Sequence, residues 1–154
     1  MKENKLELLI PPPVIALLTA IMVYVVNRLL PAGLHLPGDR WLGFVFVVVG
    51  FALALAGAVQ FKRASTTIHP QNPEHTSSLV THGVYRLSRN PMYLGMLLVL
   101  FGWVLYLGNL VSAVCLLLFI LYINQFQIVP EERIIKNKFG AEFEQYCSRV
   151  RRWL

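Results

Sequence analysis

The chain has few charged residues for its length. Only 14% of its 154 residues are Asp, Glu, Lys or Arg, whereas 56% are hydrophobic. Soluble domains carry roughly 25% charged residues, so this deficit argues against a soluble protein and indicates a membrane protein. The net charge of +6 could suggest a nucleic-acid partner. The basic residues, however, lie between apolar runs and form no stripe on a polar face, so we expect no such partner.

Cysteine is also scarce. Cys115 lies in an apolar run and Cys147 in a charged tail, which indicates neither a disulfide framework nor a zinc site. The polar loop at 62–90 contains three histidines, His69, His75 and His82. They show neither HxH nor HxxxH spacing and have no nearby cysteine, so we expect no metal site. No small-residue cleavage site follows the first apolar run, which we therefore expect to remain as a membrane span.

Four apolar runs are candidates for membrane spans, since crossing the hydrocarbon core takes about 20 helical residues. They cover residues 14–30, 41–61, 91–107 and 110–129. These runs predict an all-α integral membrane fold of four transmembrane helices in one domain over 1–154. The third and fourth are separated so briefly that they must form a tight antiparallel hairpin. Glycines and alanines in the second run would let helices approach closely, although ordinary membrane-helix composition explains them equally well.

The basic residues predict the orientation in the membrane. Of the 14 Lys and Arg residues, only Arg28 and Arg40 lie on one side of the predicted spans. The others lie in the N-terminal tail, the loop at 62–90 and the tail at 130–154. The positive-inside rule therefore places both termini and this loop in the cytoplasm, which requires an even number of spans.

The tail at 130–154 predicts an amphipathic helix. Pro130 followed by two glutamates is typical of a helix start. Apolar residues then recur at steps of three or four, at Ile135, Phe139, Phe143, Tyr146, Val150 and Trp153. Such a helix would lie on the membrane surface or cover a pocket. By the same capping rules, Asn90 and Pro91 predict the start of the third span.

These segments together resemble a known family. HGVYRLSRNPMYLG at 82–95 precedes the hydrophobic hairpin, and PEERIIKNKFGAEFEQYCSRVRRWL follows it. The order resembles the isoprenylcysteine carboxyl methyltransferase family and the related phospholipid methyltransferases. Their pattern is Arg-His-Pro-x-Tyr-x-Gly, a hydrophobic stretch and a Glu-Glu pair. The resemblance covers about residues 60–154, and this chain has Asn90 where the family usually has histidine.

The resemblance implies a membrane methyltransferase that uses S-adenosylmethionine and releases S-adenosylhomocysteine. The cofactor would lie on the cytoplasmic side, between the parts at 62–95 and 130–154, and the absence of a Gly-rich dinucleotide fingerprint agrees with this. The implied catalytic residues are Arg89 and Tyr93. The implied cofactor-binding residues are His82, Gly83, Tyr85, Asn90, Tyr93, Gly95, Glu131, Glu132, Phe139 and Tyr146.

The chemistry of this cofactor suggests roles for these residues. Glu131 or Glu132 would pair with its ammonium group or accept from its ribose hydroxyls, and the start of the third span would bind its carboxylate. Aromatic residues of the tail would hold the adenine. Arg89 would either orient an anionic acceptor or serve the structure alone. Asn90 can cap a helix or donate a hydrogen bond but cannot transfer a proton, which argues against a catalytic role there.

The methyl acceptor would be a lipid-like molecule with a carboxylate, thiol or amine, entering from the bilayer. The short chain favours a prokaryotic inner membrane, and the sequence does not indicate the oligomeric state. Two alternatives remain open. One is a membrane NADPH-dependent reductase of the sterol-reductase type. The other is a small four-span transporter, which usually needs an acidic residue inside a span.

Overall fold

The computed structural model describes residues 7–30, 40–63 and 78–154, and within these ranges it contains helices and no strand. The α-helices are α1 (Pro12–Leu29), α2 (Arg40–Arg63), α3 (Pro91–Leu107), α4 (Val114–Ile123), α5 (Val129–Phe139) and α6 (Ala141–Arg149). Two 3₁₀ turns, η2 (Gly83–Arg86) and η3 (Leu110–Ala113), and a π-helix, η4 (Asn124–Ile128), connect them.

Within the described ranges, three helices are long and apolar enough to cross a membrane: α1, α2 and the helical stretch Leu110–Phe139. α3 is apolar but shorter, at 17 residues. The all-helical membrane fold is therefore confirmed. The count of four spans and the orientation of the termini stay predictions. The bounds of α3 agree with the predicted run because Pro91 begins the helix and Gly108, in the left-handed conformation (φ 71°), ends it.

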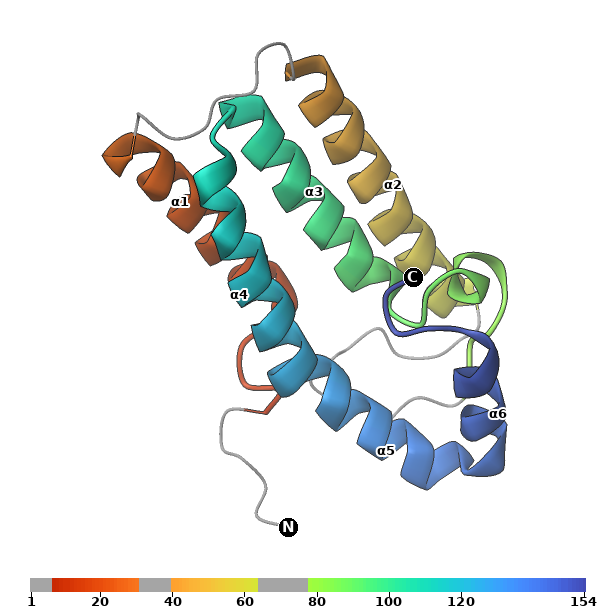
Figure 1. The fold of residues 1–154 in the computed structure, drawn as a ribbon. Helices are drawn as coiled ribbons and strands as arrows, with labels where there is room; N and C mark the ends of the chain where they lie inside the picture. The colour runs from red at the N-terminus through yellow and green to blue at the C-terminus, as the bar shows by residue number, and fades with distance from the viewer. Residues whose placement is uncertain (1–6, 31–39, 64–77) are drawn as a thin grey trace.

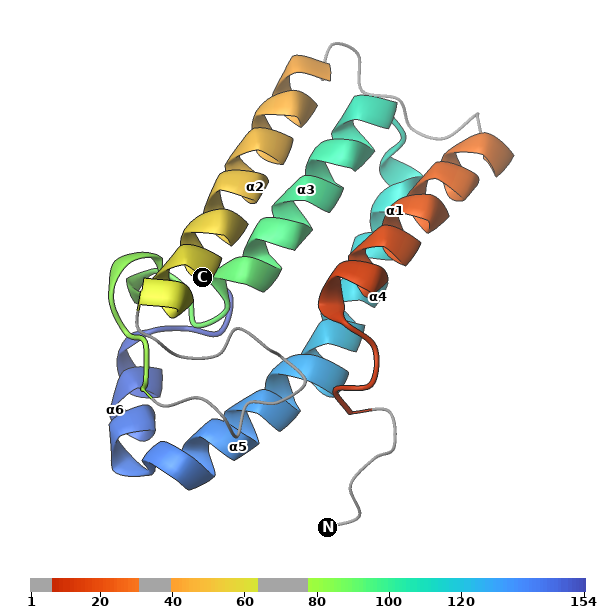
Figure 2. The same ribbon diagram turned by 180° about the vertical axis from the view of Figure 1, so that it is seen from behind.

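The helices are arranged around α3 (Figures 1 and 2). α2 runs antiparallel along one side of α3, and α1 lies on its other side, next to α4. α4 returns antiparallel to α3, as the short connection predicted. Asn109 fixes this connection, since its side chain accepts from the Val111 N–H and donates to the Leu30 carbonyl at the end of α1.

Glycines bring α2 and α3 into close contact. A Cβ atom placed on Gly50 would lie 2.6 Å from the Gly95 carbonyl oxygen, and one on Gly95 would lie 2.5 Å from that of Gly50. Gly43 and Gly102 face each other in the same reciprocal way. Backbones this close gain dispersion energy without the help of a hydrophobic effect, which is weak between helices in lipid. The small residues of α2 therefore have a packing role.

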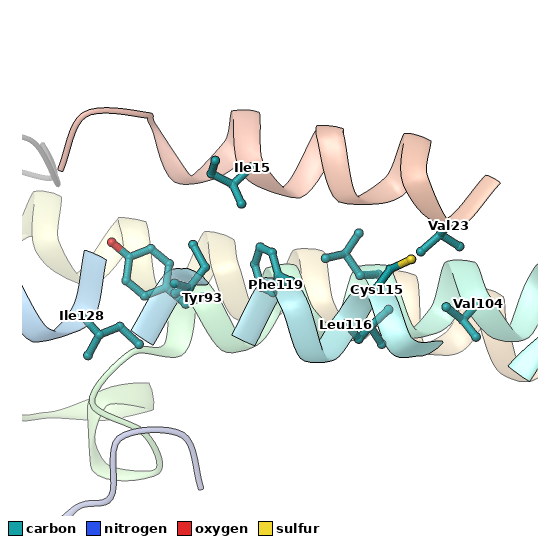
Figure 3. Close-up of a cluster of buried hydrophobic side chains, with 10 residues drawn as sticks. Ile15, Val23, Tyr93, Val104, Cys115, Leu116, Phe119 and Ile128 are labelled. Atoms are coloured by element: carbon teal, nitrogen blue, oxygen red, sulfur yellow. The ribbon is translucent and has the colours of Figure 1, made fainter. Parts of the chain in front are cut away.

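The core between α1, α3 and α4 is apolar along most of its length. Its buried side chains include Ile15, Val23, Val104, Cys115, Leu116 and Phe119 (Figure 3). Tyr93 and Ile128 end this cluster on the side where α5 begins. The core therefore places one polar atom, the Tyr93 hydroxyl, beside the acidic start of α5.

Pro130 lies in the first turn of α5, as predicted, but α5 is not separated from the helix before it. The chain stays helical from Val114 to Phe139, through the π-helix just before the proline. A proline inside a helix lacks the N–H that would bond the carbonyl four residues earlier, here that of Phe126. The Leu8 N–H of the N-terminal segment donates to that carbonyl at 2.9 Å instead. A long-range bond thus satisfies the group that the proline leaves free.

The prediction of one amphipathic helix through the tail is wrong. The chain breaks at Gly140, whose φ of 50° and ψ of −121° are not helical, and α6 then turns back toward the start of α3 (Figure 1). The turn lets Phe143, Tyr146 and Val150 of the second half pack against Phe139 of the first half. Residues 150–154 leave the helix and form what we call the C-terminal segment.

Candidate active site

Three parts of the chain meet at one end of the helices: the start of α3, the first turn of α5 and the C-terminal segment (Figures 1 and 2). Their ionic and phenolic side chains contact one another there. We call this group the carboxylate cluster, and it consists of Arg89, Tyr93, Glu131, Glu132 and Arg152. It lies at the end of the apolar core that Tyr93 and Ile128 mark.

Glu131 is bound by Tyr93. The Tyr93 hydroxyl donates to Glu131 Oε1 at 2.5 Å, and the Tyr93 side chain is buried, with 6% of its surface exposed. Hydrogen bonds to a carboxylate are shorter and stronger than those between neutral groups. The contact orients the Glu131 carboxylate at the mouth of the apolar core.

Glu132 is bound by two arginines. Arg89 Nη2 lies 2.9 Å from Glu132 Oε1, and Arg152 donates to both carboxylate oxygens, from Nε at 3.2 Å and from Nη2 at 2.6 Å. The side chain of Arg89 is 14% exposed and that of Glu132 is 19% exposed. Arg89 Nε is buried and has no hydrogen-bond partner. The cluster thus holds a donor that its own carboxylates do not use.

Asn90 does not cap α3 with its side chain, which corrects the capping interpretation. Its Nδ2 donates to the Arg152 carbonyl at 3.0 Å, and no side-chain bond to the helix start forms. Two more hydrogen bonds join the same two segments. Ser88 Oγ donates to the Arg152 carbonyl, and the Arg89 N–H donates to the Arg151 carbonyl. The start of α3 therefore holds the C-terminal segment in place.

The segment before α3 is fixed by α2 and α6. Tyr146 donates to the Tyr85 carbonyl at 2.6 Å, and burial raises the pKa of both phenols above their usual range, so they stay neutral. Gln60 of α2 clamps the turn when its amide donates to the His82 carbonyl (2.7 Å) and accepts from the Val84 N–H (3.1 Å). His82 itself is exposed.

Gly83 has a steric reason to be glycine. Its φ of 60° is left-handed, and a Cβ atom there would overlap the Gln60 side chain. Gly83 therefore lies in the turn beside α2 and outside the carboxylate cluster.

Two other predicted site residues lie away from the cluster. Gly95 faces Gly50 and Ala54 of α2, so helix packing explains why this position is a glycine. Phe139 is partly buried in the apolar cluster of α5 and α6 that also contains Tyr146. The aromatic residues expected to hold adenine therefore form a small core that fixes α6.

Sequence reasoning missed Arg152 and its anchor. Trp153 Nε1 donates to Asn124 Oδ1 at 3.1 Å, which ties the C-terminal segment to the π-helix. The available signal was the excess of arginine at the end of the chain beside a pair of adjacent glutamates. It went unused because the tail was expected to be helical up to Trp153.

Comparison with known proteins identifies the family. The family model described as Phospholipid methyltransferase matches residues 39–142. The chain belongs to this family. It is 31% identical over 140 residues to Protein-S-isoprenylcysteine O-methyltransferase A of Arabidopsis thaliana, covering 88% of this chain and 70% of that protein. No solved structure matches the chain.

Two further relatives differ in length. Protein-S-isoprenylcysteine O-methyltransferase of Schizosaccharomyces pombe is 32% identical over 108 residues, which are 68% of this chain and 44% of that protein. An uncharacterised Haemophilus influenzae protein is 51% identical over 63 residues, which are 41% of this chain and the whole of that protein. The predicted resemblance is thus confirmed, and the family indicates an integral membrane methyltransferase.

Proposed function

We propose that this chain transfers a methyl group from S-adenosylmethionine to a lipophilic acceptor in the membrane. The observation that carries the proposal is the carboxylate cluster, which places two glutamates, two arginines and a buried tyrosine at the end of an apolar core. Membership of a methyltransferase family supports the reaction class.

The cluster has the donors and acceptors that this cofactor requires. Glu131 and Glu132 match its ammonium group and its ribose hydroxyls. The unused Arg89 Nε is an N–H donor suited to a carboxylate. The cluster therefore has carboxylates for the ammonium group and the ribose hydroxyls of the cofactor, and an N–H donor for its carboxylate. We propose that Glu131, Glu132 and Arg89 hold the cofactor.

The chain's own part in the reaction is to align the reactants and exclude water. When bound, S-adenosylmethionine supplies a methyl group already activated by its sulfonium, so neither a metal nor a covalent enzyme intermediate is needed. Tyr93 orients Glu131 through its 2.5 Å bond. Buried apolar neighbours such as Ile128 keep water from this end of the core. Asn90 transfers no proton, so the proposed chemistry uses none at that position.

We propose a carboxylate as the acceptor group, with a thiol or an amine as alternatives. The relatives are named for O-methylation of isoprenylcysteine, and a carboxylate needs no general base at neutral pH. Arg89 would attract such an anion. Basic residues near this end of the helices include Lys62, Arg63, Arg86, Lys136 and Lys138. By the positive-inside rule they support a site that faces the cytoplasm. We propose a prokaryotic inner membrane as its location.

Calorimetry on the detergent-solubilised protein tests the cofactor. We expect S-adenosylhomocysteine to bind at micromolar concentration and NADPH not to bind. Binding of NADPH without binding of S-adenosylmethionine or S-adenosylhomocysteine would refute the proposal and favour a reductase. Glu131→Gln should weaken binding of S-adenosylhomocysteine while the protein remains folded.

Methyl transfer tests the acceptor. We expect label from methyl-labelled cofactor to enter a farnesylated N-acetylcysteine, and not the methyl ester of the same molecule, in which the carboxylate is blocked. Label in the ester would exclude the carboxylate. Label only in a total membrane lipid extract would direct the search to an amine or thiol headgroup.

A further inference from the structure

Arg152 lies at a junction between the start of α3 and the first turn of α5. Its guanidinium donates twice to Glu132, and its own carbonyl accepts from Asn90 Nδ2 at 3.0 Å and from Ser88 Oγ at 3.2 Å. The same residue is therefore held by the start of α3 and in turn holds a carboxylate of α5.

These contacts close into a ring. Asn90 holds the Arg152 backbone, the Arg152 side chain holds Glu132, and Glu132 also accepts from Arg89, which directly precedes Asn90 in the chain. A ring of this kind fixes the Glu132 carboxylate from both sides. The hydrogen bond from Trp153 to Asn124 fixes the next residue of the C-terminal segment against the π-helix.

The contacts of Asn90 argue against the simpler role of a helix cap and assign its side chain a link to the C-terminal segment. Its side chain makes no capping bond to α3, so it is not needed to begin that helix. One of the two N–H groups of its amide is bonded to the Arg152 carbonyl, which leaves the second N–H and the amide oxygen for any other contact. A neutral amide is a donor at every working pH, which suits a permanent structural link.

We propose that Asn90 is a positioning residue that acts through Arg152: its amide fixes the C-terminal segment so that the Arg152 guanidinium orients the Glu132 carboxylate for the bound cofactor. The proposal rests on the proposed function, because it assigns Glu132 to cofactor binding. It explains why asparagine suffices at the position where the pattern that the sequence resembles has histidine. A donor is required there, and a titratable group is not.

The test is a double-mutant cycle on the full-length protein in detergent. S-adenosylhomocysteine affinity is measured by calorimetry for the wild type, Asn90→Ala, Arg152→Gln and the double variant, and the melting temperature is recorded for each. Asn90→Asp is a second single variant, which keeps the size of the side chain and removes the donor. Arg151→Gln is the matched control, because Arg151 is exposed and only its carbonyl joins the link.

We expect each single variant to weaken binding about threefold to tenfold, the effect of losing one hydrogen bond. The double variant should be no weaker than the worse single variant, because both changes break the same link. Arg151→Gln should bind as the wild type does.

Additive losses in the double variant would overturn the link between the two residues. Tighter binding by Arg152→Gln would also overturn it, because Arg152 would then compete with the ligand for Glu132. A fall in melting temperature with unchanged affinity would assign Asn90 a structural role only. Failure of the wild type itself to bind S-adenosylhomocysteine would refute the proposed function instead.

Discussion

The close contact between α2 and α3 allows an estimate of how much one added methyl group destabilises the protein. In Gly50→Ala the new Cβ would lie 2.6 Å from the Gly95 carbonyl oxygen and 2.8 Å from the Val99 nitrogen. Carbon–oxygen contacts normally begin at about 3.3 Å, and neither backbone atom can rotate away. The helices must separate, and overpacking of this kind costs about 1–3 kcal/mol. We expect a value near the upper end, because both contacts are with backbone.

Gly57→Ala is the matched control on the same face of α2. Its Cβ would lie 2.9 Å from Met92 Cγ, and its nearest neighbours are side-chain atoms, so a change in the Met92 χ1 angle relieves the clash without separating the backbones. Both substitutions gain the same helix propensity, about 1 kcal/mol, so their difference isolates the clash. At about 2–4 °C per kcal/mol for a chain of this size, Gly50→Ala should melt roughly 4–12 °C below Gly57→Ala in detergent. Equal melting temperatures would refute the close approach of the two helices.

Three further changes test the site and its supports. Tyr93→Phe removes only the donor to Glu131, so S-adenosylhomocysteine affinity measured by calorimetry should fall about threefold to tenfold. Unchanged affinity would show that this hydrogen bond has no role in ligand binding. Tyr146→Phe leaves the buried Tyr85 carbonyl without its 2.6 Å partner, which should cost about 1–3 kcal/mol in thermal unfolding; an unshifted transition would contradict this. Burial raises the pKa of Cys147, with Arg89 opposing it. Less thiolate is then present at pH 7.5 than for free cysteine, so maleimide should label this thiol more slowly and the rate should rise with pH; labelling at the free rate would contradict the burial.

The helices that cross the core were predictable because their ends have local signals. Pro91 and Gly108 bound α3 as the sequence rules require, and the two-residue connection after it gave the hairpin. The course of the chain at Pro130 was not predictable, because it depends on Leu8, which supplies a hydrogen bond from the other end of the sequence. Local rules treat a proline as a boundary and take no account of a distant donor that removes the need for one.

The carboxylate cluster was predictable only in part, for a similar reason. The pairing of Tyr93 with the glutamates followed from the order of the motifs, since the hairpin returns the chain to the same end of the helices. Arg152 was missed because the periodic apolar residues of the tail favoured one straight helix. The left-handed φ of Gly140 breaks that helix, and a single glycine in an amphipathic pattern gives little warning of this.

The closed ring around Glu132 has a thermodynamic consequence. If Arg152 orients Glu132 for the cofactor, then bound cofactor must in turn favour the docked position of the C-terminal segment, because coupling between two binding events is reciprocal. Because Asn90 helps to hold the C-terminal segment, cofactor affinity would depend in part on a contact that the ligand does not make. A titratable residue at this position would make that contact vary with pH through its own charge. The neutral amide of Asn90 removes that dependence, so in this chain the strength of the link is set by geometry and not by protonation.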